Sequence, residues 1–307
     1  MVCNCCSIDQ IISYICENEY QYFFQKKNVV GVGVGYKVQG GFCTNKKSLI
    51  VFVSNKISSN ELSCNDLIPP LYRGIITDVM ESGTIQFQKL TQKSRPVEGG
   101  FAIGVEGTME STTMGCLVTD GKYKYVLTTN HGIVKDQFAI GRNILQPSPQ
   151  NGGKVPEDII GTISKFIPLK YKGTFTEPTN LVDCCMIIVL QESLVSPKIH
   201  FLNTPPLGVA NPELNIDVQK IGSATEKTIG KILSVSATMK LEFNKKDYIF
   251  KKQIVTTKMT GDGDSGAIVL NMRNFAVGMA IGGSQSITVV NNMANVLKSL
   301  NVNIVTH

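Results

Sequence analysis

The sequence predicts a mainly β protein in which a small α+β unit precedes a larger region of short strands. From about residue 96 onward, short β-type runs alternate with turns rich in Gly, Asn, Pro and Lys, which is typical of a sandwich or barrel. The preceding part combines one helical stretch with a few strand-like runs. Residues 88–100 are polar and contain Arg95-Pro96, so we interpret them as a linker. We therefore expect two domains, at residues 1–95 and 96–307.

Composition describes a globular chain and excludes several function classes. Hydrophobic residues make up 42% of the 307 residues and charged residues 18%, which is enough apolar mass for real cores. The net charge of +6 is spread along the chain without basic runs interleaved with aromatics, so we expect no nucleic-acid partner. No apolar stretch reaches the roughly 18 residues of a membrane helix, and the N-terminus lacks the pattern of a signal peptide. We expect no membrane association.

Cysteine usage favours a reducing compartment. The chain has nine cysteines, an odd number, so at least one is not in an internal disulfide. Together with the missing secretory signal, this predicts free thiols and a cytoplasmic location. Cys3, Cys5 and Cys6 form a cluster, but with Cys16 as the next thiol the spacing does not match paired C-x-x-C metal ligands. We favour a solvent-facing terminus over a metal site, and expect no metal and no other cofactor.

The N-terminal region reads as a helix followed by strands. Ser7 and Gln10 have the spacing of a capping box, and apolar residues at helical spacing predict a helix over residues 8–24. Its apolar stripe must dock on its own domain or on a regulatory protein partner. Val29 to Val38 alternates as a strand, with glycines at 31, 33 and 35 on one face. Because no helix follows, these glycines indicate close packing of another segment rather than a phosphate loop. Further strands are expected at 48–53 and 74–79.

The C-terminal region contains nine expected strands and one helix. The strands are expected at 114–119, 123–129, 159–166, 184–190, 216–222, 229–242, 247–257, 266–270 and 275–281, and the helix at Asn291 to Leu300.

The stretch Met259 to Leu270 concentrates the chemistry, because glycines and aspartates crowd around Ser265 ahead of a β-type run. Glycine lets successive amides point at one place, where they bind an oxyanion beside a serine nucleophile. The alternative is a Gly/Asp-rich hairpin turn. A nucleophilic serine also needs a base, which makes the histidines decisive.

Three histidines are available as the base. His307 is the last residue, and His200 lies in a polar loop. His131 ends the strand-like run 123–130, where a side chain is rigidly held, although a surface histidine at a strand end is the alternative. Asp183 stands directly before a long apolar run, where a carboxylate is costly unless something pairs with it.

Asp183 is the favoured orienting acid, because a buried carboxylate can hydrogen-bond one imidazole nitrogen and fix the ring. Capping of local amides at the strand start is the alternative role. Asp158 is the rival acid, but no buried run of comparable length follows it.

Three blocks of the sequence resemble the motif blocks of trypsin-like serine proteases: Thr128-Thr-Asn-His131, Val182-Asp183 and Gly263-Asp-Ser-Gly266. Thr113 to Val118, and Ile221-Gly222 with Gly230, resemble bacterial members. The resemblance covers roughly residues 98 to 300. It implies a chymotrypsin-like double β-barrel with the His and Asp in the first barrel and the Ser in the second, here behind an α+β N-terminal domain.

The resemblance also implies the chemistry. Ser265 is expected to be the nucleophile, His131 the general base and Asp183 its orienting carboxylate, with the N–H groups of Gly263 and Ser265 as the oxyanion hole. The implied function is a serine endopeptidase that forms an acyl-enzyme on a protein or peptide substrate. A catalytically silent binding module that recognises peptides or partner proteins remains the alternative, and ester hydrolysis is a third.

The chain departs from the family at the expected substrate-binding residues. Met259 occupies the position six before the serine, at the base of the family's specificity pocket, so an apolar or small P1 residue is expected. Ile281, Gly282 and Gly283 fall where the family pairs an edge strand with the substrate backbone, and the glycines leave the pocket wall open. Gly132 follows the histidine where animal members often carry cysteine, so Cys116 is expected to lack the usual disulfide partner.

Activation is left open by the sequence. In secreted family members a newly cut N-terminus pairs with the aspartate beside the serine, here Asp264. The Arg95-Pro96 bond is a poor site for trypsin-like cleavage. Either Asp264 is satisfied internally or a partner switches the enzyme on through the N-terminal domain.

Overall fold

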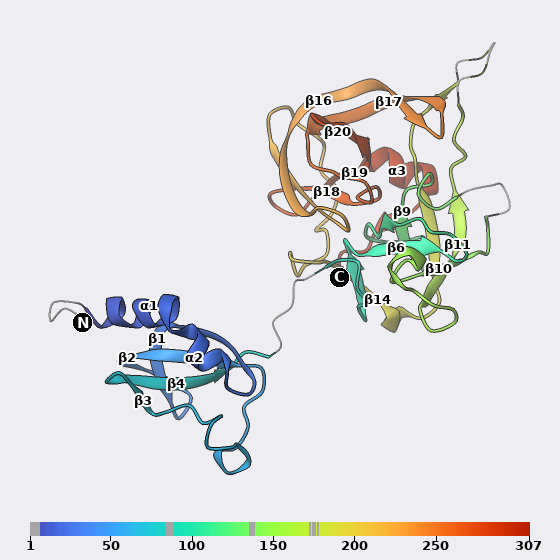
Figure 1. Ribbon diagram of the computed structural model, residues 1–307. Helices are drawn as coiled ribbons and strands as arrows, with labels where there is room; N and C mark the ends of the chain where they lie inside the picture. Colours follow the sequence, from blue (N-terminus) through green and yellow to red (C-terminus); the bar gives the residue numbers. More distant parts are fainter. Residues whose placement is uncertain (1–6, 84–88, 135–138, 172, 174–175, 177) are drawn as a thin grey trace. The chain divides into compact units, whose positions relative to one another are not determined.

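The computed structural model describes residues 7–83, 89–134, 139–171, 173, 176 and 178–307. Contacts divide the chain into two compact units, Met1–Gln88 and Lys89–His307, each considered by itself (Figure 1). The cluster of Cys3, Cys5 and Cys6 lies outside the described residues.

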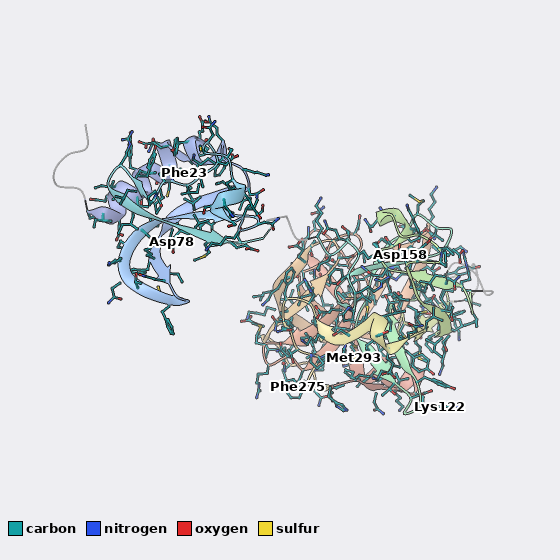
Figure 2. All side chains as sticks on the ribbon, turned by 90° about the horizontal axis from the view of Figure 1, so that it is seen from below. Phe23, Asp78, Lys122, Asp158, Phe275 and Met293 are labelled. Atoms are coloured by element: carbon teal, nitrogen blue, oxygen red, sulfur yellow. The ribbon has the colours of Figure 1, made fainter. Side chains whose placement is uncertain are left out.

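The N-terminal unit is a four-stranded sheet packed against two helices. Its elements are α1 (Ile8–Asn18), α2 (Tyr20–Phe24), β1 (Val29–Gln39), β2 (Phe42–Val53), η1 (Ser59–Glu61), β3 (Leu71–Tyr72) and β4 (Ile75–Glu81), with strand order β1-β2-β4-β3. The Ser7 capping box forms as predicted, but the helix is interrupted at Glu19, where φ is −126°. Ile12, Ile15 and Phe23 are fully buried and cluster with Leu49 and Val51 of the sheet, so the apolar stripe docks within its own unit. Figure 2 labels Phe23 in this unit.

The glycines of β1 make room for side chains of β2. A Cβ on Gly35 would lie 2.6 Å from Cγ1 of Ile50, and one on Gly31 or Gly33 would meet the Phe52 ring at 3.4 Å. The close packing predicted for this face is therefore supplied by the neighbouring strand.

The C-terminal unit contains two large sheets. The first has eight strands in the order β21-β8-β9-β13-β11-β10-β6-β7. They are β6 (Ala102–Val105), β7 (Thr112–Thr113), β8 (Leu117–Thr119), β9 (Lys124–Thr128), β10 (Asn143–Leu145), β11 (Ile159–Phe166), β13 (Cys185–Val189) and β21 (Asn303–Ile304). β13 lies between β9 and β11, which explains its continuous apolar run.

The second sheet closes on itself. Its order is β12-β17-β16-β15-β18-β19-β20, and an additional pairing joins β17 to β20, so six strands form a ring with β12 attached outside. The strands are β12 (Thr179–Asn180), β15 (Asp217–Gly222), β16 (Glu226–Phe243), β17 (Lys246–Thr257), β18 (Ile268–Asn271), β19 (Ala276–Gly283) and β20 (Ile287–Asn292). Closure gives every strand of the ring a partner on both sides along at least part of its length. Helix α3 (Met293–Leu300) packs on β19 and β20, and Met293 is fully buried.

The segment interpreted as a linker packs on the C-terminal unit. Leu90 is 1% exposed in that unit's core, and Lys93 forms an ion pair with Asp158 at 2.5 Å. Val97–Gly99 forms strand β5, which pairs in parallel with β14 (Val195–Ile199). The contacts therefore place the boundary before Lys89, whereas the sequence-based boundary followed residue 95, because a polar, charged stretch conceals one well-buried leucine.

The late helix begins after its predicted start. Asn292 caps α3 by accepting from the N–H of Asn295, and Asn291 belongs to β20. The strand β20 was not predicted, nor were the short β6, β10 and β14, because brief runs beside turns carry weak periodicity.

Leu90→Ala should destabilise the C-terminal unit by about 2–5 kcal/mol, since a buried leucine is truncated in a packed core. Hydrogen exchange followed by mass spectrometry on the full chain would measure the loss of stability separately in each of the two units. The matched variant Leu214→Ala removes a leucine that is 56% exposed and should change stability by under about 0.5 kcal/mol. Unchanged exchange in the C-terminal unit of Leu90→Ala would show that residues 89–95 are a linker after all.

Candidate active site

Asp183 and His131 meet at the ends of neighbouring strands. His131 follows the end of β9, and Asp183 precedes β13, its partner strand. The Asp183 Oδ2 lies 2.5 Å from the His131 Nδ1, and Oδ1 accepts from the N–H groups of Asn130 at 2.7 Å and His131 at 3.1 Å. Asp183 is only 2% exposed. A carboxylate at Nδ1 places the proton of the neutral ring there and leaves Nε2 as the acceptor.

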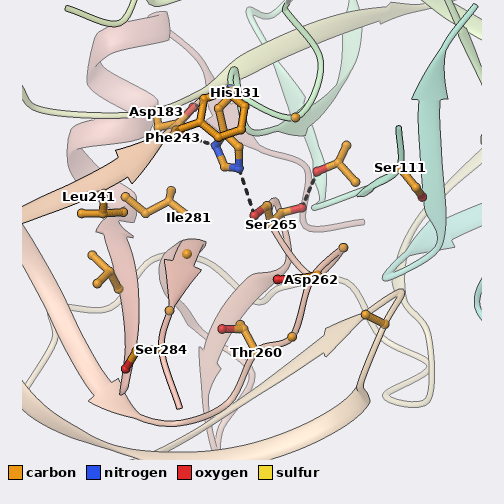
Figure 3. Close-up of a pocket in the computed structure, with 18 of the residues that line it drawn as sticks. Ser111, His131, Asp183, Leu241, Phe243, Thr260, Asp262, Ser265, Ile281 and Ser284 are labelled. Carbon is orange, nitrogen blue, oxygen red and sulfur yellow. Dashed lines mark hydrogen bonds and ion pairs between the residues drawn. The ribbon is translucent and has the colours of Figure 1, made fainter. Parts of the chain in front are cut away.

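Ser265 lies at that acceptor. Its Oγ is 3.1 Å from the His131 Nε2, which completes a line from Asp183 through His131 to Ser265 (Figure 3). The Ser265 carbonyl accepts from the Thr112 hydroxyl at 2.6 Å and from the Thr113 N–H at 2.8 Å. Gly266 follows with φ +96°, and a Cβ there would collide with the Thr113 carbonyl oxygen. The glycine therefore permits the close contact that holds the serine.

The surroundings of His131 stabilise its protonated form more than water does. Burial opposes the charge on His131, but the negative charge of Asp183 and its hydrogen bond outweigh burial and raise the pKa of His131 above its ordinary value of 6.5. A ring whose pKa is raised in this way is a stronger base than free imidazole.

The loop before Ser265 is arranged as an amide nest. Gly263 adopts φ +106°, and its carbonyl accepts from the hydroxyls of Thr113 at 2.8 Å and Ser223 at 3.0 Å. With the carbonyl held from behind, the N–H groups of Gly263 and Ser265 donate to no other residue in the described part of the chain. They are available to an oxyanion.

Asp264 is paired inside the fold. Its Oδ2 lies 2.9 Å from the Lys220 Nζ, and both side chains are 0% exposed. Its Oδ1 accepts from the N–H groups of Ala224 at 2.9 Å and Thr225 at 3.1 Å. Burial opposes the charge on Asp264, but Lys220 and the Thr225 hydroxyl outweigh it and lower the pKa of Asp264. Burial also lowers the pKa of Lys220 despite the attraction of Asp264.

Solved structures of bacterial proteases resemble this chain at low identity. Thermobifida fusca protease A matches 69% of this chain and 99% of its own, with 17% identity and a TM-score of 0.51. Cellulomonas bogoriensis chymotrypsin matches 69% and 99%, with 17% identity and a TM-score of 0.50. An α-lytic protease homologue, N4, matches 68% and 99%, with 15% identity and a TM-score of 0.50. No protein-family model and no curated protein matches the chain.

The chain contains a chymotrypsin-fold domain. The expectation of a double β-barrel behind a small α+β unit is therefore confirmed. His131 and Asp183 come from the first sheet of this fold, and Ser265 from the loop between β17 and β18 in the second.

Of the four expected substrate-binding residues, three line the cleft and one does not. Met259 is 2% exposed and packs in the core of the closed barrel, so it does not line the cleft; its neighbours Lys258 and Thr260 do. In an extended segment adjacent side chains point to opposite sides, and position 259 points inward. Ile281, Gly282 and Gly283 do line the cleft, as expected.

The competing residues have structural partners elsewhere. The His200 Nδ1 lies 2.7 Å from Glu98 Oε2, and Asp158 bonds Lys93 and the N–H of Lys154. Cys116 is buried and carries a free thiol. The described residues contain no group of three or more His, Cys, Asp and Glu side chains that could hold a metal, and none of the described helices is long and apolar enough to span a membrane.

A long hairpin forms one wall of the cleft, which has a volume of about 1200 Å³. β16 and β17 join through Asn244 and Lys245, both with positive φ, as a two-residue hairpin turn requires. The Phe243 ring lies 5.2 Å from the His131 ring, edge to face. The sequence predicted both strands but not that their hairpin borders the cleft. The alternation of apolar residues that ends at Phe243 was the signal for this wall.

Lys220→Met should destabilise the domain by about 3–5 kcal/mol, because it leaves the buried charge of Asp264 without its counter-charge. Adding Asp264→Asn to that variant should recover much of the loss, as measured by chemical denaturation. Lys231→Met is the matched control, because its pair with Asp217 is exposed and worth at most about 1 kcal/mol. A double variant no more stable than Lys220→Met would contradict the assigned pairing.

Proposed function

We propose that this protein is a serine endopeptidase. The observation that carries the proposal is the hydrogen-bonded line from Asp183 through His131 to Ser265, at 2.5 Å and 3.1 Å. Asp183 also accepts from the N–H of Asn130, the His131 ring packs on Phe243, and the backbone carbonyl of Ser265 is bonded by the residues of β7. A protein or peptide is the substrate, and no cofactor takes part.

The reaction follows from the protonation states. His131 Nε2 takes the Ser265 hydroxyl proton as Oγ attacks the substrate carbonyl carbon, and Asp183 stabilises the imidazolium that forms. The N–H groups of Gly263 and Ser265 bind the oxyanion of the tetrahedral intermediate. The C–N bond then breaks, and His131 returns the proton to the leaving amine. Water, deprotonated by His131, attacks the acyl-enzyme and releases the acid with Ser265 restored.

The substrate backbone is bound as an added strand. β19 pairs with β20 up to Gly283, whereas β18 accompanies β19 only as far as the bonds between Ala267 and Ala280 in the described chain. The edge at residues 281–283 therefore faces the cleft beside Ser265. An extended peptide pairing there presents its carbonyl to the serine.

A silent binding module is the competing proposal, and ester hydrolysis would use the same groups. The reactivity of Ser265 toward a fluorophosphonate distinguishes an enzyme from a silent binding module. A fluorophosphonate probe should label the wild-type chain at Ser265, and Ser265→Ala should abolish the labelling. The matched variant Ser111→Ala removes another hydroxyl at the cleft and should label normally. Absence of labelling of the folded wild type would favour the binding module.

The hairpin supports a preference for apolar residues beside the scissile bond. Met239, Leu241 and Phe243 alternate with outward Lys240 and Glu242 along β16, and Leu241 packs over Gly282 at the cleft. Adjacent side chains of an extended substrate point to opposite sides. When P1 enters between the 260–263 loop and β19, P2 points toward His131 and Phe243. An apolar P2 residue therefore replaces water on this wall.

Phe243→Ser should lower kcat/KM for a peptide with leucine at P2 by about tenfold, and should change the matched peptide with serine at P2 much less. Steady-state kinetics on the two peptides measure the ratio. Lys245→Ser, at the hairpin turn, is the control and should leave the ratio unchanged. An unchanged ratio in Phe243→Ser would place the P2 side chain away from the hairpin.

A further inference from the structure

Two buried amide side chains of the second barrel bond the segment that carries Asp183. Gln253 lies on β17 and Asn291 on β20, and both are 0% exposed. Asn291 Oδ1 accepts from the N–H of Asp183 at 2.7 Å. Gln253 Nε2 donates to the carbonyl of Leu181 at 2.9 Å, and also to that of Lys251 at 2.6 Å. The two amides thus bond consecutive peptide groups, those that link Leu181 to Val182 and Val182 to Asp183.

The chemistry of these partners determines how each amide is oriented. A peptide N–H can only donate, so the atom of Asn291 facing Asp183 is the oxygen. A carbonyl can only accept, so the atom of Gln253 facing Leu181 is the nitrogen. The Nδ2 donor of Asn291 and the Oε1 acceptor of Gln253 are left over, and neither has a hydrogen-bond partner among the described residues.

The two remaining atoms are complementary, and the residues that carry them are neighbours in the sheet. Gln253 and Asn291 are directly paired in the β17–β20 register. Directly opposed residues of an antiparallel pair project from the same face, with Cβ atoms roughly 5 Å apart. A buried donor and a buried acceptor on such neighbours that are not bonded directly are satisfied by one shared water.

We propose that Gln253 and Asn291 form an amide clamp that positions Asp183 for catalysis. The clamp consists of these two side chains, joined to each other and bonded to the backbone at Leu181 and Asp183. Neither touches a reacting atom, so both are positioning residues. The role in catalysis rests on the proposed serine protease function, whereas the positioning of Asp183 does not.

The clamp has a specific mechanical effect. Asn130 and His131, from the first barrel, bond the carboxylate of Asp183, while Asn291 bonds its backbone from the second barrel. The second barrel also carries Ser265. The clamp therefore fixes the position of Asp183 relative to Ser265. His131 lies between these two residues, and the second barrel determines the distance between them.

Asn291→Leu tests the clamp, because leucine fills a similar volume and cannot accept the Asp183 N–H bond. We expect kcat to fall about ten- to 100-fold through misplacement of the acid, with KM changed less than about twofold. Gln253→Met should act in the same direction. The double variant should lose little more than Asn291→Leu alone, because the two residues act as one unit.

Gln219→Met is the matched control. Gln219 is another buried amide of the same barrel, 4% exposed, and it bonds Asn274 rather than the Asp183 segment. It should lower thermal stability as Asn291→Leu does while kcat stays near the wild-type value. Equal losses of kcat in the two variants would reduce Asn291 to a structural residue and overturn the proposal.

A second measurement is independent of hydrolysis. In the Ser265→Ala background, NMR titration of the His131 ring protons reports the contact with Asp183. Adding Asn291→Leu should move the pKa of His131 down toward its ordinary value, and adding Gln219→Met should not. An unchanged pKa in folded Asn291→Leu would refute the clamp. A shifted pKa in a chain whose wild type hydrolyses no peptide would refute the proposed function and keep the clamp.

Discussion

One buried carboxylate joins the parts of this site. Asp183 is 2% exposed, and removing a carboxylate from water is costly unless hydrogen bonds replace hydration. The bonds come from Asn130 and from both the backbone and the ring of His131. The strand end at β9 and the start of β13 must therefore stay in register. The orientation of His131, and with it the contact between its Nε2 and the Ser265 Oγ, depends on this register.

The residues closest to the chemistry could be predicted from sequence because each carries a local signal. Ser265 lies among glycines whose backbone freedom has a chemical use, and Gly263 and Gly266 adopt positive φ. His131 ends a strand, and Asp183 begins an apolar run. Each of these patterns involves residues that are close together in the sequence, and so do the turns and strand ends that the patterns predict. The two-barrel architecture followed from the resemblance rather than from the strand pattern, which fitted a sandwich or a barrel equally.

The supporting residues were missed because long-range pairing places them. Lys220 occupies a strand and resembles any exposed lysine until the fold brings Asp264 to 2.9 Å. Asn291 was assigned to a helix because it stands one residue before the Asn292 cap. Met259 was expected in the pocket from its spacing to Ser265, yet the local direction of the side chain, which spacing does not determine, turns it into the core.

The Lys220–Asp264 pair has a consequence for timing. The counter-charge to Asp264 lies within strand β15, so it is in place as soon as the strand is paired. The loop that carries Ser265 is therefore held in place by the fold itself, through the pair between Asp264 and Lys220. A newly cut N-terminus is not needed to balance the charge of Asp264, because Lys220 already lies against it.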